Sequence, residues 1–188
     1  MTEHRAEKTG FRSSSNRLEE PSISLAALRG VDPFIERTDY PLVVVTTASP
    51  DGERSGCLAG FTTQCSIEPP RFLVCISKIN HTFDVVTRSE VLALHLLGED
   101  QGDVASLFGE KTGDAVDKFA NIGWRADALG VPVIDECAAW LVVGILRRIN
   151  AGDHTALMTF PIVGGPGPRP GLLTLRSVPT LKAGHPAN

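Results

Sequence analysis

The feature that most restricts how this chain can fold is a succession of short apolar segments that are rich in β-branched residues. Sequences typical of turns separate these segments. Residues 42–47 and 54–59 form the first pair, and Ser49-Pro50-Asp51-Gly52 between them is strong turn chemistry. This pair predicts a β-hairpin, whose strands are antiparallel. Further strands are predicted over 61–67, 71–77, 91–97, 139–149 and 154–160, and residues 172–175 are a candidate for a last strand.

Helical patterns are short and lie between the strands. Ser24 predicts the start of a helix over 25–28, which Gly30 ends, and Asn80 predicts the start of another over 81–88. Two more are predicted over 103–108 and 114–119, whereas residues 164–168 predict an irregular loop. Strands joined by hairpins favour a mainly β fold, an antiparallel sheet or β-barrel with short peripheral helices, over a doubly wound parallel sheet.

Length and local composition set the domain organisation. The chain has 188 residues, which is enough for one domain of ordinary size. Residues 1–21 carry balanced charges and almost no apolar side chains, so they predict a disordered N-terminal arm. Residues 22–188 then predict a single domain, with a loose tail over 182–188.

Charge, cysteines and missing motifs exclude several classes of function. The net charge of -4 argues against a nucleic-acid partner, and no apolar run approaches the roughly 18 residues of a membrane span. The N-terminus lacks a signal-peptide pattern, and the four cysteines show no CxxC spacing, so we expect reduced cysteines and a cytoplasmic location. The histidines form no HxxxH pair, and neither a GxGxxG nor a P-loop pattern occurs, so no metal site is expected.

The segment 56–70 is the first candidate for a ligand site. It passes from a strand into a loop that is dense in small and hydroxyl side chains. Small residues let a flat ligand approach the backbone, and Thr62, Thr63, Gln64 and Ser66 offer neutral donors and acceptors for a ring with carbonyl and imine groups. The alternative is a barrel strand with a glycine bulge and a polar turn.

Residues 77–82 lie between the end of a strand and the start of a helix. The hydroxyls, Lys78 and the backbone N–H groups at the helix start suit a phosphate group. The alternative is simple helix capping by Asn80, which explains Asn80 and Thr82 without a ligand.

The predicted hairpin at 150–153 places Gly152-Asp153-His154 between two apolar strands. A histidine directly after a tight turn can donate or accept a hydrogen bond near a ligand, but an exposed histidine in a turn is the alternative. His95 lies inside an apolar strand and is interpreted as a core histidine. Cys57 has no base near it in the sequence and is interpreted as a small apolar filler.

These segments occur in the order and spacing of one known family, the flavin reductase-like, FMN-binding split-barrel proteins. Residues 41–47 followed by Asp51-Gly52 resemble its opening hairpin, and residues 56–70, which end in Ser66-Ile67-Glu68-Pro69-Pro70, resemble its flavin-binding strand and loop. Residues 72–75 followed by Asn80-His81-Thr82 resemble its phosphate-side turn, and residues 151–155 match its Gly-Asp-His motif. The resemblance covers residues 41–175.

The resemblance implies a Greek-key-like, antiparallel split β-barrel that binds FMN, or alternatively FAD. It implies that the protein transfers hydride from NADH or NADPH to the flavin. It also implies a homodimer and a partner monooxygenase that receives the reduced flavin. His154 is the implied catalytic residue, which orients the nicotinamide together with Gly152 and Asp153. The implied flavin-binding residues are Thr46, Cys57, Leu58, Ala59, Gly60, Phe61, Thr62, Thr63, Gln64, Cys65, Ser66, Ser77, Lys78, Asn80, His81 and Thr82.

Departures from the family pattern keep two alternatives open. Leu58, Gly60 and Phe61 stand where relatives often carry hydroxyl or amide side chains, and the strand after His154 is more apolar than usual. One alternative is therefore a non-catalytic FMN-binding or flavin-carrier protein. The other is a flavin-dependent oxidoreductase of the same fold with another substrate.

Overall fold

The computed structural model describes residues 22–113 and 115–181. The chain divides into two compact units, residues 1–38 and residues 39–188, and each is described by itself. The arm predicted over 1–21 and the tail predicted over 182–188 lie outside the described residues, and the single domain over 22–188 stays a prediction. No helix in the described part of the chain is long and apolar enough to cross a membrane.

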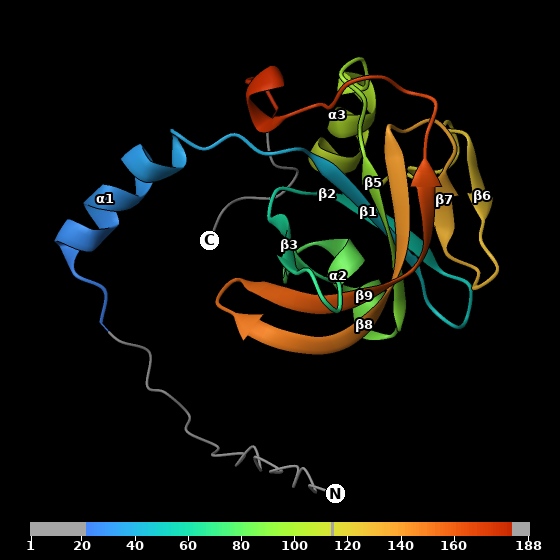
Figure 1. Cartoon of the computed structure of the whole chain (residues 1–188), viewed down its shortest axis with the longest axis horizontal. Coiled ribbons are helices and arrows are strands. Elements are labelled where there is room, and N and C mark those ends of the chain that lie inside the picture. Colours follow the sequence, from blue (N-terminus) through green and yellow to red (C-terminus); the bar gives the residue numbers. More distant parts are fainter. Residues whose placement is uncertain (1–21, 114, 182–188) are drawn as a thin grey trace, which may run out of the picture. The chain divides into compact units, whose positions relative to one another are not determined.

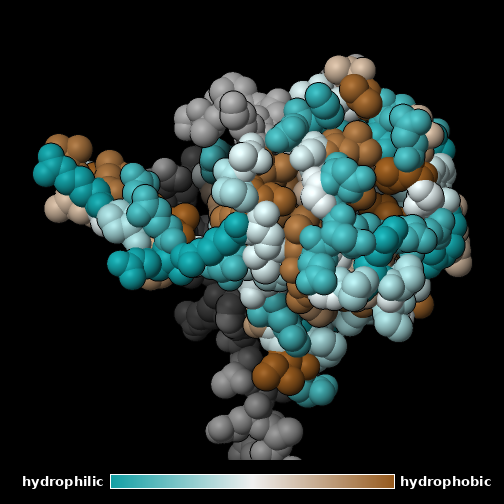
Figure 2. All heavy atoms as spheres, turned by 90° about the horizontal axis from the view of Figure 1, so that it is seen from above, coloured by the Kyte–Doolittle hydropathy of each residue, from teal (hydrophilic) through white to brown (hydrophobic). Residues whose placement is uncertain are grey.

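The first unit contains helix α1 (Leu25–Ile35). As predicted, Ser24 caps it, because the Ser24 Oγ accepts a hydrogen bond from the Ala27 N–H at 3.1 Å. The predicted end at Gly30 was wrong: Gly30 does not take a positive φ, and the helix continues through Pro33. All side chains of α1 are exposed, and Figure 2 shows hydrophobic and hydrophilic residues beside one another along it.

The second unit is built on one seven-stranded sheet. Its strands are β1 (Val43–Ala48), β2 (Arg54–Ala59), β3 (Thr62–Ser66), β4 (Arg71–Ser77), β5 (Val91–Leu96), β8 (Ala139–Ala151) and β9 (His154–Pro166). They lie in the order β2-β1-β5-β8-β9-β4-β3, and every neighbouring pair is antiparallel (Figure 1). The predicted mainly β, antiparallel fold is therefore confirmed.

The two edge strands of this sheet are consecutive in the sequence. Only Gly60 and Phe61 separate β2 from β3, so the sheet must curl until its two ends meet at this link. The two edge strands do not pair with each other, which leaves the barrel split. Because β2 pairs with β1 alone, one row of its backbone N–H and C=O groups has no strand partner.

The connections follow local sequence signals in most places. Gly52 and Gly152, with φ of 90° and 83°, form the predicted turns between β1 and β2 and between β8 and β9. Helix α2 (His81–Thr87) is capped as predicted, since the Asn80 side chain accepts a hydrogen bond from the Thr82 N–H at 2.9 Å. Helix α3 (Gly102–Glu110) extends the helix predicted over 103–108.

Three local predictions in this unit were wrong. Residues 115–119 form turns and not a helix, and residues 172–175 make one isolated bridge, between Pro41 and Thr174, before the short helix η1 (Leu175–Ser177). Strand β9 continues through the expected loop at Gly164 because it pairs with β8 along its whole length. A separate two-stranded sheet of β6 (Trp124–Ala126) and β7 (Pro132–Ile134) was not predicted.

Strand β1 is apolar along its length because both of its faces are buried. Val43 and Val45 belong to the cluster inside the barrel, whereas Val44 belongs to the cluster under α3 that includes Phe108. His95 on β5 is fully buried, with Nδ1 3.0 Å from the Val44 carbonyl oxygen and Nε2 accepting from the Ile134 N–H at 3.1 Å. The interpretation of His95 as a satisfied core histidine is confirmed.

Candidate functional site

The link between β2 and β3 lines a cavity of about 240 Å³, which we call the Phe61 cavity. Its walls come from β2, the end of β4, the turn before α2 and the start of β9. Tyr40 and Leu175 also line it, although no sequence pattern singled them out. The cavity brings together eight predicted site residues, Cys57, Leu58, Ala59, Gly60, Phe61, Ser77, Asn80 and His154.

Phe61 and His154 meet in this cavity from two different parts of the chain. Their ring centroids are 5.4 Å apart with an interplanar angle of 64°, an edge-to-face contact. The Phe61 carbonyl oxygen accepts a hydrogen bond from the Cys75 N–H at 3.0 Å, which holds the link against β4. The Phe61 side chain is 52% exposed, so an aromatic surface stands open at the split of the barrel.

The Asp153 carboxylate orients the His154 ring. Oδ1 of Asp153 lies 2.8 Å from Nδ1 of His154. This hydrogen bond, followed by the charge of His154, lowers the pKa of Asp153, so the carboxylate is ionised and accepts the Nδ1 proton. In the neutral imidazole Nε2 is then an acceptor, which suits an N–H donor on a ligand.

A second cavity, of about 480 Å³, follows the next stretch of β2, and we call it the Lys118 cavity. Residues 52–56, His81 and the loop residues 115–119 line it. The two cavities adjoin along β2 and along the turn into α2, because the Phe61 cavity takes residues 57–61 and Asn80. We call the two cavities together the β2 cleft, because successive stretches of β2 line them.

Polar groups on the wall of the Lys118 cavity are already tied to one another. His81 Nε2 lies 3.4 Å from a carboxylate oxygen of Glu53, and the hydroxyls of Ser55 and Thr82 share a buried hydrogen bond of 3.0 Å. Lys118 is 4% exposed. Ser55 and Lys118 lie in no sequence motif, and only the return of residues 115–119 to β2 brings them to one cavity.

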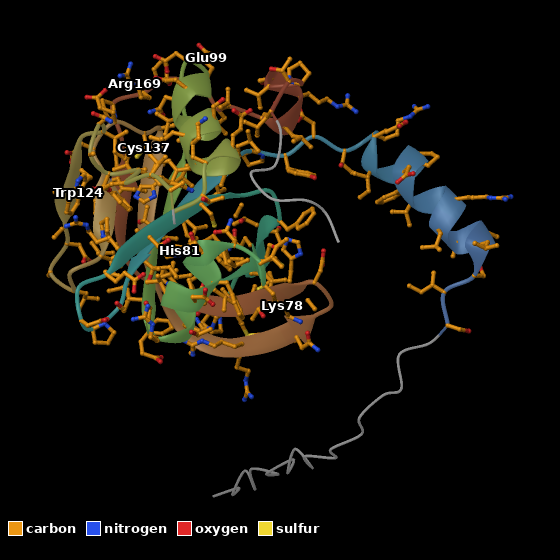
Figure 3. The ribbon with its side chains drawn as sticks, turned by 180° about the vertical axis from the view of Figure 1, so that it is seen from behind. Lys78, His81, Glu99, Trp124, Cys137 and Arg169 are labelled. Carbon is orange, nitrogen blue, oxygen red and sulfur yellow. The ribbon has the colours of Figure 1, made fainter. Side chains whose placement is uncertain are left out.

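Eight predicted flavin-binding residues line neither cavity. Thr46 donates from its buried hydroxyl to the Pro132 carbonyl, and Thr82 is buried against Ser55. Lys78 Nζ donates to Asn150 Oδ1 at 2.6 Å and to the Gly152 carbonyl, so it lies beside the β8–β9 hairpin, apart from His81 on α2 (Figure 3). The other five lie on β3, beyond the link, and they are Thr62, Thr63, Gln64, Cys65 and Ser66.

The thiol of Cys57 has the properties of a packed side chain. It is buried, and burial raises its pKa to about 11, so the thiol stays protonated and is a poor nucleophile.

Among residues 22–113 and 115–181, no group of three or more His, Cys, Asp or Glu side chains could hold a metal ion.

The sequence model of the flavin reductase-like domain matches residues 35–159, which is most of the second unit. The chain belongs to the flavin reductase-like domain family. This confirms the resemblance drawn from the four motifs, and the matched range contains β2, α2, Lys118 and His154.

Curated members of this family are similar over a large part of the chain. The FMN reductase (NADH) RutF of Variovorax paradoxus is 30% identical over 141 residues, which cover 68% of this chain and 75% of that protein. The stachydrine N-demethylase reductase subunit Stc3 of Rhizobium meliloti is 32% identical over 117 residues, 62% of this chain. That match covers only 50% of Stc3, so this chain corresponds to part of that relative.

A solved structure shows the same fold. The NADH:FAD oxidoreductase SgcE6 of Streptomyces globisporus superposes with a TM-score of 0.70 at 25% identity, over 80% of this chain and 90% of that one. The curled, open sheet described above is therefore the split barrel of this family.

Proposed function

We propose that this chain is a flavin reductase that transfers hydride from NADH or NADPH to a flavin bound in the cleft beside β2. The observation that carries the proposal is the Phe61 cavity, where residues 57–61 of the predicted flavin strand meet His154 of the Gly-Asp-His motif. The activities in the names of RutF and SgcE6 support it. FMN is the proposed flavin, with FAD as the alternative.

The residues of the cleft fit a flavin. Gly60 has no side chain to keep a flat ring from the backbone, and Phe61 offers an exposed aromatic surface at the same place. The Lys118 cavity continues the cleft along β2 and suits the ribityl phosphate. When bound, the flavin supplies the redox chemistry, and the protein supplies binding and orientation.

His154 is proposed to orient the nicotinamide. With Nδ1 held by Asp153, Nε2 is left to accept a hydrogen bond from a donor such as a carboxamide N–H. The hydride transfer needs no proton from this side chain, so its contribution is position alone.

The proposal is tested by two measurements on the purified full chain. FMN is titrated by fluorescence quenching, and the oxidation of NADH and of NADPH is followed with FMN as acceptor. Saturable FMN binding with FMN-dependent oxidation supports a reductase. FMN binding without oxidation of either nucleotide supports the flavin-carrier alternative, which Leu58 in the cleft favours, and the absence of FMN binding would contradict both.

His154→Ala is expected to lower kcat/KM for the nicotinamide substrate by about two- to tenfold, because one hydrogen bond to a neutral group is lost. The Kd for FMN should change less than twofold. Steady-state kinetics at saturating FMN check this, with circular dichroism to confirm the fold.

Asp153→Asn is the matched control, since its amide oxygen can still accept from Nδ1, and its effect should be smaller. Inactivation of His154→Ala by orders of magnitude, or no change at all, would show that His154 does not have this orienting role.

We also propose a homodimer, a cytoplasmic location and a partner monooxygenase that uses the reduced flavin. The reductase-subunit name of Stc3 supports a partner. Leu146, Ile149, Ile162 and Val163 on β8 and β9 are each more than 40% exposed, and such apolar surfaces favour association. Light scattering on a sizing column tests the dimer.

A further inference from the structure

Lys118 is a buried cation, and its hydrogen bonds to the described residues all go to backbone carbonyl groups. Its Nζ donates to the Gly56 carbonyl oxygen at 3.0 Å and to the Phe108 carbonyl oxygen at 3.2 Å. The same nitrogen lies 5.6 Å from the centroid of the Phe108 ring. No ion pair between described residues includes Lys118, although only 4% of the residue is exposed.

An ammonium group has three N–H donors, and the two carbonyls account for two of them. The third N–H of Lys118 has no hydrogen-bond partner among the described residues, and Lys118 lines the Lys118 cavity. Burial lowers the pKa of Lys118, which means that the charged form lacks full compensation where it sits. An anion in the cavity would supply that compensation.

The other charged groups of the cavity already have partners. Glu53 forms an ion pair with Arg88 and a second contact with His81. Asp117 Oδ1 accepts a hydrogen bond from the Phe119 N–H at 2.9 Å, and the Arg54 guanidinium stacks 4.7 Å above the Trp124 ring. Arg54 is exposed and its stacking uses none of its N–H donors, so Lys118 is the buried cation that the described residues of this wall offer to a ligand.

We infer that Lys118 binds the phosphate group of the flavin, a role for which the sequence alone suggests Lys78. This inference rests on the proposed function. Lys78 has its ammonium turned to the β8–β9 hairpin and lines neither cavity. Lys118 lines the cavity beside residues 52–56, whereas His154 lines the cavity beside residues 57–61.

The competing role is structural, because Lys118 also ties the edge strand β2 to the end of α3 through the two carbonyls. Binding of FMN and of riboflavin, which differ only in the phosphate, distinguishes a phosphate-binding role of Lys118 from a structural one. A residue that binds the phosphate affects FMN alone, whereas a residue that only shapes β2 affects both flavins equally.

The test measures the Kd for FMN and for riboflavin in the full chain and in three variants, Lys118→Met, Lys118→Gln and Arg147→Met. We expect both Lys118 variants to weaken FMN binding about tenfold or more, the effect of losing a charge-assisted hydrogen bond, and to change riboflavin binding less than twofold. Arg147 is an exposed residue of β8, so Arg147→Met controls for the loss of one positive charge and should change neither Kd.

The Gln variant keeps a donor for the carbonyls without the charge, so it serves if Lys118→Met does not fold, as judged by circular dichroism. Equal losses for both flavins, or an unchanged FMN Kd, would overturn the inference. The inference would also be overturned if Lys78→Met weakened binding of FMN but not of riboflavin, while the Lys118 variants bound both flavins like the wild type. A wild-type chain that binds neither flavin would instead reject the proposed function itself.

Discussion

Acidification from pH 6.5 to pH 4 is expected to lower the free energy of unfolding by about 3 kcal/mol through His95 alone. Burial, and then the charge of Arg125, lower the pKa of this imidazole to about 4. Its two hydrogen bonds, to the Val44 carbonyl and from the Ile134 N–H, hold the neutral ring in place. Between these two pH values the unfolded chain binds a proton that the folded chain does not bind, so stability is lost as the pH falls.

Urea denaturation across this pH range checks the expectation, with His95→Gln as the matched variant. Glutamine offers an NH2 group that donates and a carbonyl oxygen that accepts, and it does not titrate. The variant will be less stable at neutral pH, but its loss between pH 6.5 and pH 4 should be smaller than that of the wild type by about 3 kcal/mol. Parallel plots of unfolding free energy against pH for the two proteins would show that the pKa of His95 is not lowered in the folded chain.

Gly56→Val is expected to lower the free energy of unfolding by about 1–3 kcal/mol, the usual cost of overpacking a filled core. A Cβ at Gly56 would lie 2.7 Å from Cε1 of Phe108 and 3.0 Å from the Val45 carbonyl oxygen. Phe108 is 1% exposed and packs edge to face against Phe119, so a shift of its ring would disturb the close-packed core. Because Gly56 also carries the carbonyl that Lys118 binds, we expect weaker FMN binding as well.

Gly60→Ala is the control for this prediction. The nearest atom to a Cβ at Gly60 is Cε2 of Tyr40, at 3.8 Å, an ordinary van der Waals contact. Its melting temperature should therefore stay close to that of the wild type, whereas Gly56→Val should melt several degrees lower. Similar melting temperatures for the two variants would show that α3 moves away from β2 at little cost.

Sequence reasoning was most successful where the determining interactions are local. The turn at Gly52 needs a positive φ, and the Asn80 side chain bonds the Thr82 N–H two residues on, so both could be predicted from a few neighbouring residues. It was least successful where a partner strand decides. Strand β9, for example, continues through Gly164 because β8 lies beside it.

For the candidate site, the sequence by itself determined the segment 57–61, the turn at Asn80 and the histidine at 154, since each lies in a recognisable motif. Only the tertiary structure decided that these three segments share one cavity, because the curling of the sheet brings β2, β4 and β9 together at the Gly60–Phe61 link. It also decided which lysine faces the cleft. The physical reason is that a side chain's burial and charge partners depend on the segments packed around it, and those segments are distant in the sequence.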